Sequence, residues 1–218
     1  MLLTGFKRWT TRWTMAVVAL GALAASGFAH SAPKTVLVLG DSLSAEYGIA
    51  RGSGWVALLE QKLEAAGIAA TVANASISGE TTSGGRTRLP ALLRQYHPAV
   101  VVIELGANDG LRGLPVAAAT DNLAAMVQAA KDEGAKVLLV GMRLPPNYGR
   151  AYTDRFAAMV PALAQRYKVG VVPFMFEGVP LEPSNFQADR LHPLARAHPA
   201  ILNNIWPQLA PLLTSPQR

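Results

Sequence analysis

Residues 35–44 read TVLVLGDSLS, a short apolar stretch that runs into a polar turn. A run of Val and Leu of this kind is typical of a strand buried on both faces, as in a parallel sheet. Similar strands are predicted at residues 70–74, 100–105, 136–140 and 170–174. Helical periodicity appears between them, at residues 55–66, 87–96, 117–133 and 152–167, and a last helix is predicted after Pro193 or Pro199. The alternation predicts an α/β fold with three layers, α/β/α, around a five-stranded parallel sheet.

The first 29 residues have the composition of a secretory signal peptide. Lys7, Arg8 and Arg12 precede an uncharged apolar run that ends at Ala29, and cleavage after Ala29 leaves small residues at the required positions, with cleavage after Ala32 as the later alternative. A retained membrane anchor is a second alternative, but the run is shorter than the roughly 20 apolar residues of a spanning helix. We predict a signal peptide over residues 1–29, a single domain over residues 33–218, a periplasmic or secreted location, and no stable membrane anchor after cleavage.

The charge and cysteine content exclude several classes of function. Lys and Arg number 20 against 14 Asp and Glu, and three of the cations fall in the predicted signal, which leaves 17 against 14. The remaining cations are dispersed, without the basic runs and interleaved aromatic residues of nucleic-acid-binding proteins. The chain has no cysteine, which excludes thiolate catalysis, cysteine-bound zinc and iron–sulfur clusters. The sequence also lacks an HExxH motif. We therefore expect no metal, no cofactor, no nucleic-acid partner, and a monomeric protein.

Polar residues follow three of the predicted strands. The first strand leads into GDSLS (residues 40–44), the second into NASISGE (residues 74–80) and the third into GANDG (residues 106–110). The carboxyl ends of parallel strands meet at one edge of the sheet, where ligands bind. Asp189 and His192 reach the same edge from the loop before the last helix. Singly, these residues are explained as turns, helix caps or a surface ion pair, but together they supply the parts of a serine hydrolase.

Acyl transfer gives each of these parts a role. We predict that Ser42 attacks the carbonyl carbon of the substrate. His192 takes the proton of Ser42 and later hands it to the leaving group, while Asp189 orients the imidazole and stabilises its charged form. Asp41 and Asp109 are expected to hold their loops through hydrogen bonds to backbone N–H groups rather than to transfer protons.

The four blocks resemble those of the SGNH, or GDSL, hydrolase superfamily, which is named for Ser42, Gly79, Asn108 and His192 as they stand here. The resemblance runs from about Thr35 to the C-terminus. Three longer stretches are similar to the bacterial periplasmic thioesterase, lysophospholipase and arylesterase members: NASISG at 74–79, ELGANDGLRG at 104–113 and RLPPNYGR at 143–150.

The resemblance carries expectations about fold, activity and site. It implies the flavodoxin-like SGNH hydrolase fold and hydrolysis of carboxylic esters and thioesters through an acyl-enzyme intermediate, with aryl esters, acyl thioesters and lysophospholipids as the substrate classes. It also implies an oxyanion hole formed by the backbone N–H groups of Ser42 and Gly79 and the side-chain amide of Asn108.

The substrate groove and two other functions stay open at this stage. Leu111, Leu144, Pro145 and Tyr148 lie in segments after the third and fourth strands, and we predict that they line an acyl groove, with local packing beneath a loop as the alternative. A carbohydrate O-acetylesterase on the same scaffold is the second function. A non-catalytic exported binding protein that kept the fold is the third.

Arg190 is a departure from the family pattern, because this position between Asp189 and His192 is often glycine. If the backbone at this position has a positive φ, Arg190 carries strain. We hypothesise that its guanidinium reaches the mouth of the site and favours acidic or phosphorylated substrates.

Overall fold

The computed structural model describes residues 33–180 and 182–214. The predicted signal peptide, residues 1–29 with its alternative end at Ala32, lies outside the described residues. The described chain contains a five-stranded parallel sheet in the order β2-β1-β3-β4-β5, which confirms the predicted α/β fold. Its strands are β1 (Lys34–Gly40), β2 (Ala70–Asn74), β3 (Val100–Glu104), β4 (Lys136–Val140) and β5 (Gly170–Val172).

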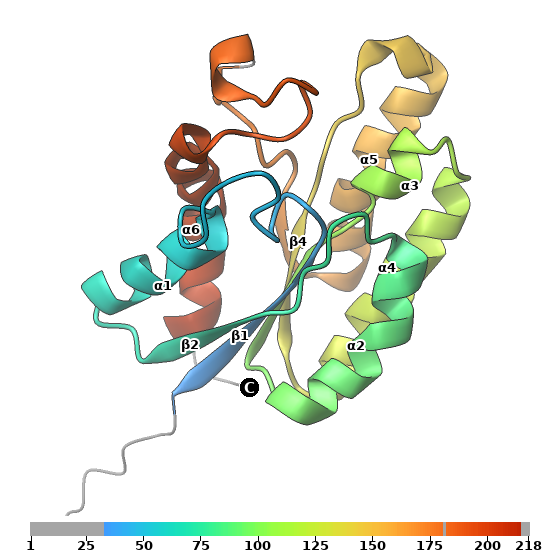
Figure 1. The fold of residues 1–218 in the computed structure, drawn as a ribbon. Coiled ribbons are helices and arrows are strands. Elements are labelled where there is room, and N and C mark those ends of the chain that lie inside the picture. Colours follow the sequence, from blue (N-terminus) through green and yellow to red (C-terminus); the bar gives the residue numbers. More distant parts are fainter. Residues whose placement is uncertain (1–32, 181, 215–218) are drawn as a thin grey trace, which may run out of the picture. The chain divides into compact units, whose positions relative to one another are not determined.

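Helices cover both faces of the sheet (Figure 1). One face is covered by α1 (Trp55–Ala65) and α6 (His198–Thr214), and the other by α2 (Thr82–Tyr96), α4 (Val116–Asp132) and α5 (Arg150–Tyr167). A short helix, α3 (Ala107–Leu111), follows β3 directly. The described residues also contain three 3-10 turns: η1 (Pro146–Tyr148), η2 (Pro183–Asn185) and η3 (Ala195–Ala197). None of the described helices combines the length and the apolar character needed to cross a membrane.

Each side of the sheet has its own hydrophobic core, because successive residues of a strand face opposite ways. Val36 and Val38 of β1 pack with the residues of α1 and α6, whereas Leu37 and Leu39 pack with those of α2, α4 and α5. All four side chains are fully buried. Burial on both faces explains why this strand reads as an unbroken apolar run.

The strand order reverses between β1 and β3, and this is what positions the site. From β1 the chain crosses to β2 at one edge and then returns to β3 on the other side of β1. The loops that leave β1 and β3 therefore diverge and leave a crevice at their carboxyl ends, which is where ligands bind in sheets of this order.

The structure shifts several of the predicted boundaries, and three of the differences from the sequence have a physical explanation. Helix α2 begins at Thr82 rather than at residue 87, because the side chain of Thr81 accepts a hydrogen bond from Gly84 N at 3.3 Å and caps the helix. Strand β5 ends at Val172 rather than at residue 174, and Pro173, which has no N–H to donate, follows it. The predicted loop over residues 106–110 is mostly helical, since α3 starts at Ala107.

Gly85 permits helix α2 to lie close to the sheet, and this gives a test of the packing. A Cβ added at Gly85 would lie 2.3 Å from Leu105 Cδ1. For Gly85→Ala, overpacking costs about 1–3 kcal/mol and the gain in helix propensity offsets about 1 kcal/mol. We expect a net loss in the free energy of unfolding, measured by urea denaturation. The loss should shrink in a Leu105→Val background, and a more stable Gly85→Ala single variant would contradict this account.

Candidate active site

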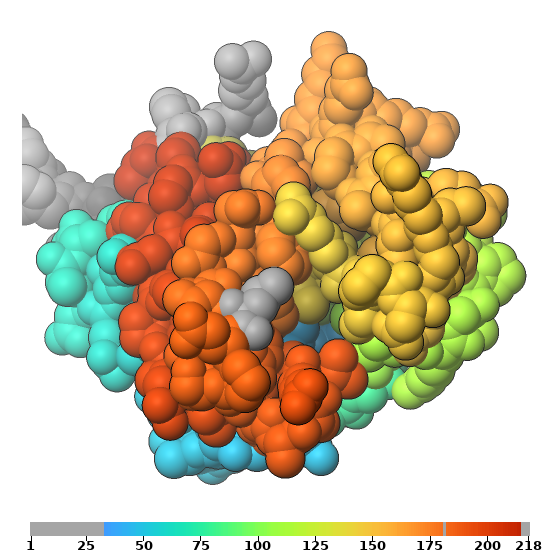
Figure 2. Space-filling model, turned by 90° about the horizontal axis from the view of Figure 1, so that it is seen from above, coloured from blue at the N-terminus to red at the C-terminus, as the bar shows by residue number. Residues whose placement is uncertain are grey.

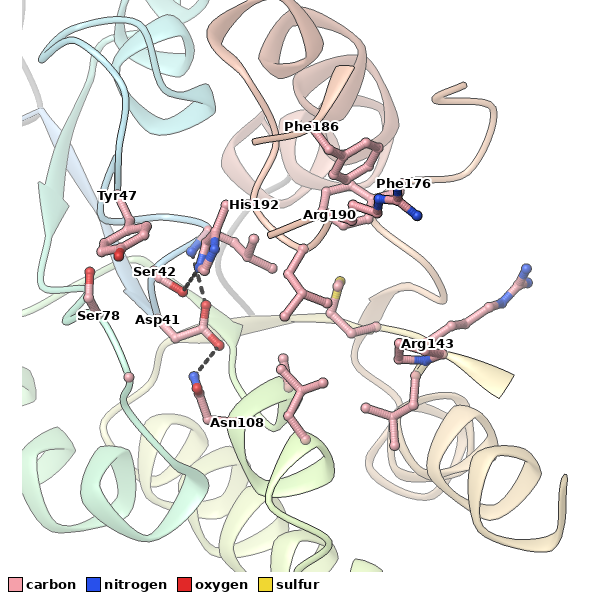
Figure 3. Close-up of a pocket in the computed structure, with 18 of the residues that line it drawn as sticks. Asp41, Ser42, Tyr47, Ser78, Asn108, Arg143, Phe176, Phe186, Arg190 and His192 are labelled. Atoms are coloured by element: carbon pink, nitrogen blue, oxygen red, sulfur yellow. Dashed lines mark hydrogen bonds between the residues drawn. The ribbon is translucent and has the colours of Figure 1, made fainter. Parts of the chain in front are cut away.

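Ser42, His192 and Asp189 form a continuous series of hydrogen bonds, of which Figure 3 shows the bond between Ser42 and His192. His192 Nε2 lies 2.8 Å from Ser42 Oγ, and His192 Nδ1 lies 2.7 Å from Asp189 Oδ2. Ser42 belongs to the turn that follows β1, whereas the other two lie in the loop between η2 and η3. Residues that are 150 positions apart in the sequence thus come within hydrogen-bonding distance. The arrangement has the geometry needed for a hydroxyl activated by an oriented base.

The loop itself holds Asp189 in its ionised form. Asp189 Oδ1 accepts hydrogen bonds from the backbone N–H groups of Leu191, at 2.9 Å, and His192, at 3.1 Å. Partial burial pulls the pKa of Asp189 upward, but these hydrogen bonds and the contact with the His192 ring outweigh it and lower the pKa below its ordinary value. An ionised carboxylate can accept a hydrogen bond from Nδ1–H, and this keeps Nε2 unprotonated and able to accept a proton from Ser42.

The backbone N–H groups of Ser42 and Gly79 have no acceptor within the described part of the chain, and both residues line the same cavity. Gly79 has φ 79, in the left-handed region that favours glycine. Unpaired N–H groups facing a cavity are suited to bind an anionic oxygen.

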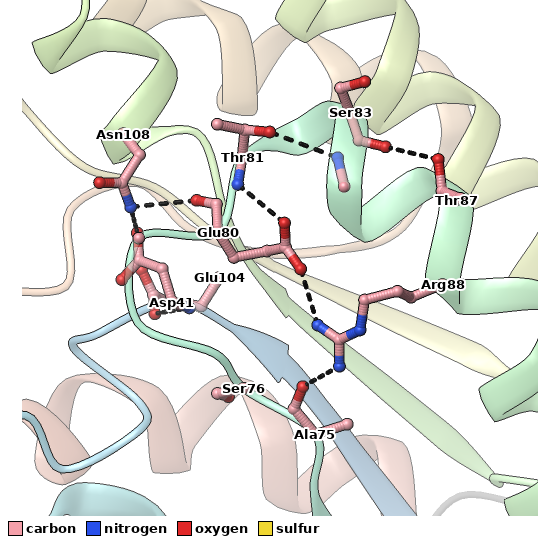
Figure 4. Close-up of polar contacts among 12 residues, drawn as sticks. Asp41, Ala75, Ser76, Glu80, Thr81, Ser83, Thr87, Arg88, Glu104 and Asn108 are labelled. Carbon is pink, nitrogen blue, oxygen red and sulfur yellow. Dashed lines mark hydrogen bonds and ion pairs between the residues drawn. The ribbon is translucent and has the colours of Figure 1, made fainter.

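The side-chain amide of Asn108 lies beside these groups but already has two acceptors (Figure 4). Its Nδ2 donates to Asp41 Oδ2 and to Glu80 O, each at 3.0 Å. The predicted oxyanion donor therefore sits at the cavity, on α3, with both amide hydrogens engaged. Before it could donate to a substrate oxygen, one of these two hydrogen bonds would have to lengthen or be shared.

Arg88 secures the loop that carries Gly79. Its Nη1 forms an ion pair with Glu80 Oε2 at 2.8 Å, and its Nη2 donates to the carbonyl of Ala75 (Figure 4). The other oxygen of the Glu80 carboxylate accepts from Thr81 N at 3.1 Å. Both ends of the loop are thereby attached to α2, which fixes the position of Gly79 relative to Ser42.

Asp41 and Asp109 both accept hydrogen bonds from the backbone. Asp41 Oδ1 accepts from Leu43 N at 3.0 Å within the turn after β1. Asp109 instead accepts from the backbone N–H of Thr82 at 2.9 Å and from its hydroxyl at 2.6 Å. Asp109 therefore holds the first residue of α2 rather than its own loop, which the sequence did not reveal.

Another buried carboxyl, Glu104, lies beneath the turn and was missed in the sequence. Its Oε2 accepts from Ser44 Oγ at 2.7 Å and from Asp41 N at 3.4 Å, while Trp55 Nε1 donates to Ser44 Oγ at 3.2 Å. Among the described residues, no group bonds its buried Oε1. The sequence did contain one signal for this residue, because Glu104 is an acidic residue at the end of a strand that otherwise consists of Val and Ile.

Burial determines the ionisation of this pair of carboxyls. Loss of solvent raises the pKa of Asp41 to about 6, although the Leu43 N–H, His192 and Asn108 act to lower it. Loss of solvent and the neighbouring Asp41 charge raise the pKa of Glu104 well above its ordinary value. Two carboxylates this close and this deeply buried resist double ionisation, so Glu104 carries the proton.

The site opens into a cavity of about 870 Å³. Figure 2, which looks down on the carboxyl ends of the strands, shows the hollow between the segment after β5, in orange, and the loop after β4, in yellow. The predicted groove residues Leu111, Leu144 and Pro145 line it. Further apolar lining comes from residues that were not predicted as groove residues: Leu43, Phe174, Phe176 and Phe186.

Tyr148 does not line this cavity, which corrects the prediction for this residue. Its hydroxyl donates to Leu111 O at 2.9 Å, so the side chain attaches η1 to the end of α3. Its role in the structure is to support the wall rather than to form it.

Within residues 33–180 and 182–214, no cluster of three or more His, Asp or Glu side chains is arranged to hold a metal ion.

Comparison with known proteins agrees with this geometry. The model of the GDSL-like lipase/acylhydrolase family matches residues 38–200. The chain belongs to this family. As expected from the sequence, it is a member of a family of serine-type acylhydrolases.

Relatives in the GDSL-like family are similar over most of their length. Esterase TesA of Pseudomonas aeruginosa (strain PAO1) is 52% identical over 184 residues, which cover 84% of this chain and 92% of the relative. Thioesterase 1/protease 1/lysophospholipase L1 of Escherichia coli (strain K12) is 44% identical, with 85% of this chain and 88% of the relative covered. The crystal structure of TesA superposes with a TM-score of 0.80 and 52% identity, and covers 83% of this chain and 100% of that one.

The raised pKa values of the buried carboxyls predict how stability depends on pH. A carboxyl with a raised pKa in the folded state binds its proton more tightly than in the unfolded state. Its contribution is complete below the unfolded pKa and is lost as pH rises through the folded pKa. The contribution of Asp41 to the free energy of unfolding should therefore be lost between about pH 4 and pH 6, and that of Glu104 should be lost as the pH rises further.

Glu104→Gln removes the titrating group and keeps its shape. We expect this variant to gain stability relative to the native protein as pH rises from 5 to 8, measured by urea denaturation at each pH. Glu60→Gln, at an exposed position of α1, is the matched control and should leave the slope unchanged. A Glu104→Gln curve parallel to the native one would contradict the assignment.

Proposed function

We propose that this chain hydrolyses carboxylic esters and thioesters, with aryl esters, acyl thioesters and lysophospholipids as its substrate classes. The observation that carries the proposal is the hydrogen-bonded series from Asp189 through His192 to Ser42, at the wall of a cavity lined mainly by apolar side chains. The names of the relatives, an esterase and a thioesterase/lysophospholipase, support the same substrate classes.

In the proposed reaction Ser42 is the nucleophile. Its Oγ forms a bond to the carbonyl carbon while its proton passes to His192 Nε2, and Asp189 stabilises the imidazolium. The bond from the carbonyl carbon to the leaving oxygen or sulfur then breaks, and His192 returns the proton to that atom. A water molecule repeats the sequence on the acyl-enzyme, with its proton passing through His192 to Ser42 as the carboxylate leaves.

The oxyanion would be held by the N–H groups of Ser42 and Gly79 and by Asn108. The first two are unpaired in the described part of the chain. Asn108 would join them by giving up one of its present acceptors, and the hydrogen bond that remains would orient the amide. The two acceptors that bind the Asn108 amide in this structure therefore hold it in position as a donor, although one of the two hydrogen bonds is given up when the oxyanion is bound.

The cavity lining favours an acyl chain over a sugar. Leu111, Leu144 and Pro145 present aliphatic surface, and a groove of this kind suits a hydrocarbon chain. The family comparisons add no support for a carbohydrate O-acetylesterase or for a non-catalytic binding protein.

We further propose that the protein is monomeric and that it is exported to the periplasm or medium through residues 1–29.

Ser42→Ala tests the nucleophile. Hydrolysis of p-nitrophenyl esters from acetate to palmitate should fall about 10⁴- to 10⁶-fold in this variant, because the acyl-enzyme cannot form. Ser83→Ala, an exposed serine of α2, is the matched control and should retain native activity. An optimum confined to acetate would favour a deacetylase. Native and Ser42→Ala proteins that are equally inactive on every ester would leave the binding protein as the better explanation.

Asn108→Ala tests the oxyanion donor. Loss of one such donor lowers kcat by about 10²- to 10³-fold, and KM should change little because the interaction forms mainly in the transition state. Asn122→Ala is the control, since Asn122 Nδ2 also bonds a structural partner, Thr82 Oγ1 at 3.1 Å, but does not line the cavity. An equal loss of kcat in both variants would show that Asn108 acts only through the structure.

A further inference from the structure

Arg190 adopts a backbone conformation that favours glycine. Its φ is 59, between two members of the proposed triad, and its N–H donates to Gln187 O at 2.9 Å to close the turn. The turn requires a left-handed residue at this position, and glycine would adopt that conformation without strain. The arginine side chain is therefore not a requirement of the turn. A strained residue at such a site is a reason to look for a function of its side chain.

The Arg190 side chain lines the cavity and has no ionic partner. In Figure 3 it lies on the same side of the pocket as Phe176 and Phe186. Within the residues that the structure describes, its guanidinium forms neither an ion pair nor a hydrogen bond. Arg190 is exposed, so its five N–H donors are accessible, and their planar arrangement is well suited to bind a planar or tetrahedral anion.

The other charged groups of the cavity wall already have partners. Arg143 pairs with Glu177 at 3.4 Å and lies over the Phe174 ring at 4.5 Å. Asp41 is buried and bonded to Leu43 N and Asn108. Among the described residues that line the cavity, Arg190 is thus the cation without an acidic partner.

The position of Arg190 in the chain indicates which part of a substrate it would meet. His192 must reach the leaving oxygen or sulfur to protonate it, so the leaving group passes along the loop that carries His192. Arg190 belongs to that loop. The aliphatic residues Leu111, Leu144 and Pro145 come from α3 and from the segment after β4, away from this loop in sequence, and are available to the acyl chain.

We propose that Arg190 is a specificity-determining residue that selects esters with an anionic group, such as a sulfonate, phosphate or carboxylate, on the leaving-group side. This inference rests on the proposed ester hydrolysis at Ser42. It adds the charge of the preferred substrate and the residue that recognises it.

Three aryl esters separate the sources of negative charge. Phenyl butyrate is neutral, 4-butyryloxybenzenesulfonate carries its anion on the leaving group, and phenyl hydrogen glutarate carries it on the acyl chain. Each is compared between variants, so that differences in chemical reactivity cancel. In Arg190→Gln, the ratio of kcat/KM for the sulfonate to that for phenyl butyrate should fall about fivefold at low salt, the range of an exposed ion pair.

The matched variants distinguish charge from backbone effects. Arg190→Lys should keep most of the selectivity, because it keeps the charge. Arg190→Gly should lose the selectivity, although it relaxes the turn. Arg196 is an exposed arginine of η3 outside the cavity wall, and Arg196→Gln should keep the selectivity. The selectivity should also shrink at 0.5 M NaCl, because the Debye length falls to a few ångströms.

Several results would overturn the proposal. An unchanged ratio in Arg190→Gln, or an equal loss in Arg196→Gln, would show that Arg190 recognises nothing. A loss confined to phenyl hydrogen glutarate would place the anion on the acyl side instead. If no ester is hydrolysed, the proposed function fails by itself. Calorimetry then still tests the role of Arg190, because the Kd of octanesulfonate should rise about fivefold in Arg190→Gln.

Discussion

The parallel pairing of β1 with β3 is the constraint on which the site depends. The register places Gly40 opposite Glu104, so the turn after β1 starts directly above a buried carboxyl. A Cβ at Gly40 would lie 2.7 Å from Ser44 Cβ and 2.9 Å from Glu104 Oε2, and glycine is required at this close approach. From this pairing, Ser44 reaches Glu104, Asp41 reaches Asn108, and the intervening Ser42 is left facing the cavity.

The environment separates the carboxyls of the site into two kinds. Asp189 is partly exposed and receives two backbone N–H groups, and it stays ionised. Glu104 is fully buried beside Asp41, and it holds its proton. The same functional group thus supplies a permanent charge next to His192 and a neutral support beneath the turn, and the difference comes from solvation and hydrogen bonding rather than from residue type.

Much of the fold was predictable because its signals are local. The strands that became β2 and β4 were placed at the observed residues, since apolar runs bounded by polar turns mark buried strands. The start of α2 was not found, because Gly84 and Gly85 are poor helix formers and the reason for Gly85 lies in a contact with Leu105.

The candidate site likewise contains residues that local sequence patterns predicted and contacts that these patterns could not reveal. The sequence pointed to Ser42, Asp189 and His192, and the fold brings them together. The sequence could not show that Asn108 is shared between Asp41 and Glu80, that Tyr148 supports the wall, or that Glu104 lies beneath the turn. Each of these depends on the distance between residues far apart in the chain, which no local pattern encodes.

The separation of Ser42 from His192 by 150 positions has a consequence for the folding chain. The hydroxyl lies in the turn after the first strand and its base in a loop shortly before α6, so the two meet only after the C-terminal segment has docked. Until that moment the serine is an ordinary alcohol. Chemical reactivity at Ser42 is therefore a property of the completed tertiary structure, and a partly folded or C-terminally shortened chain carries an inert side chain at this position.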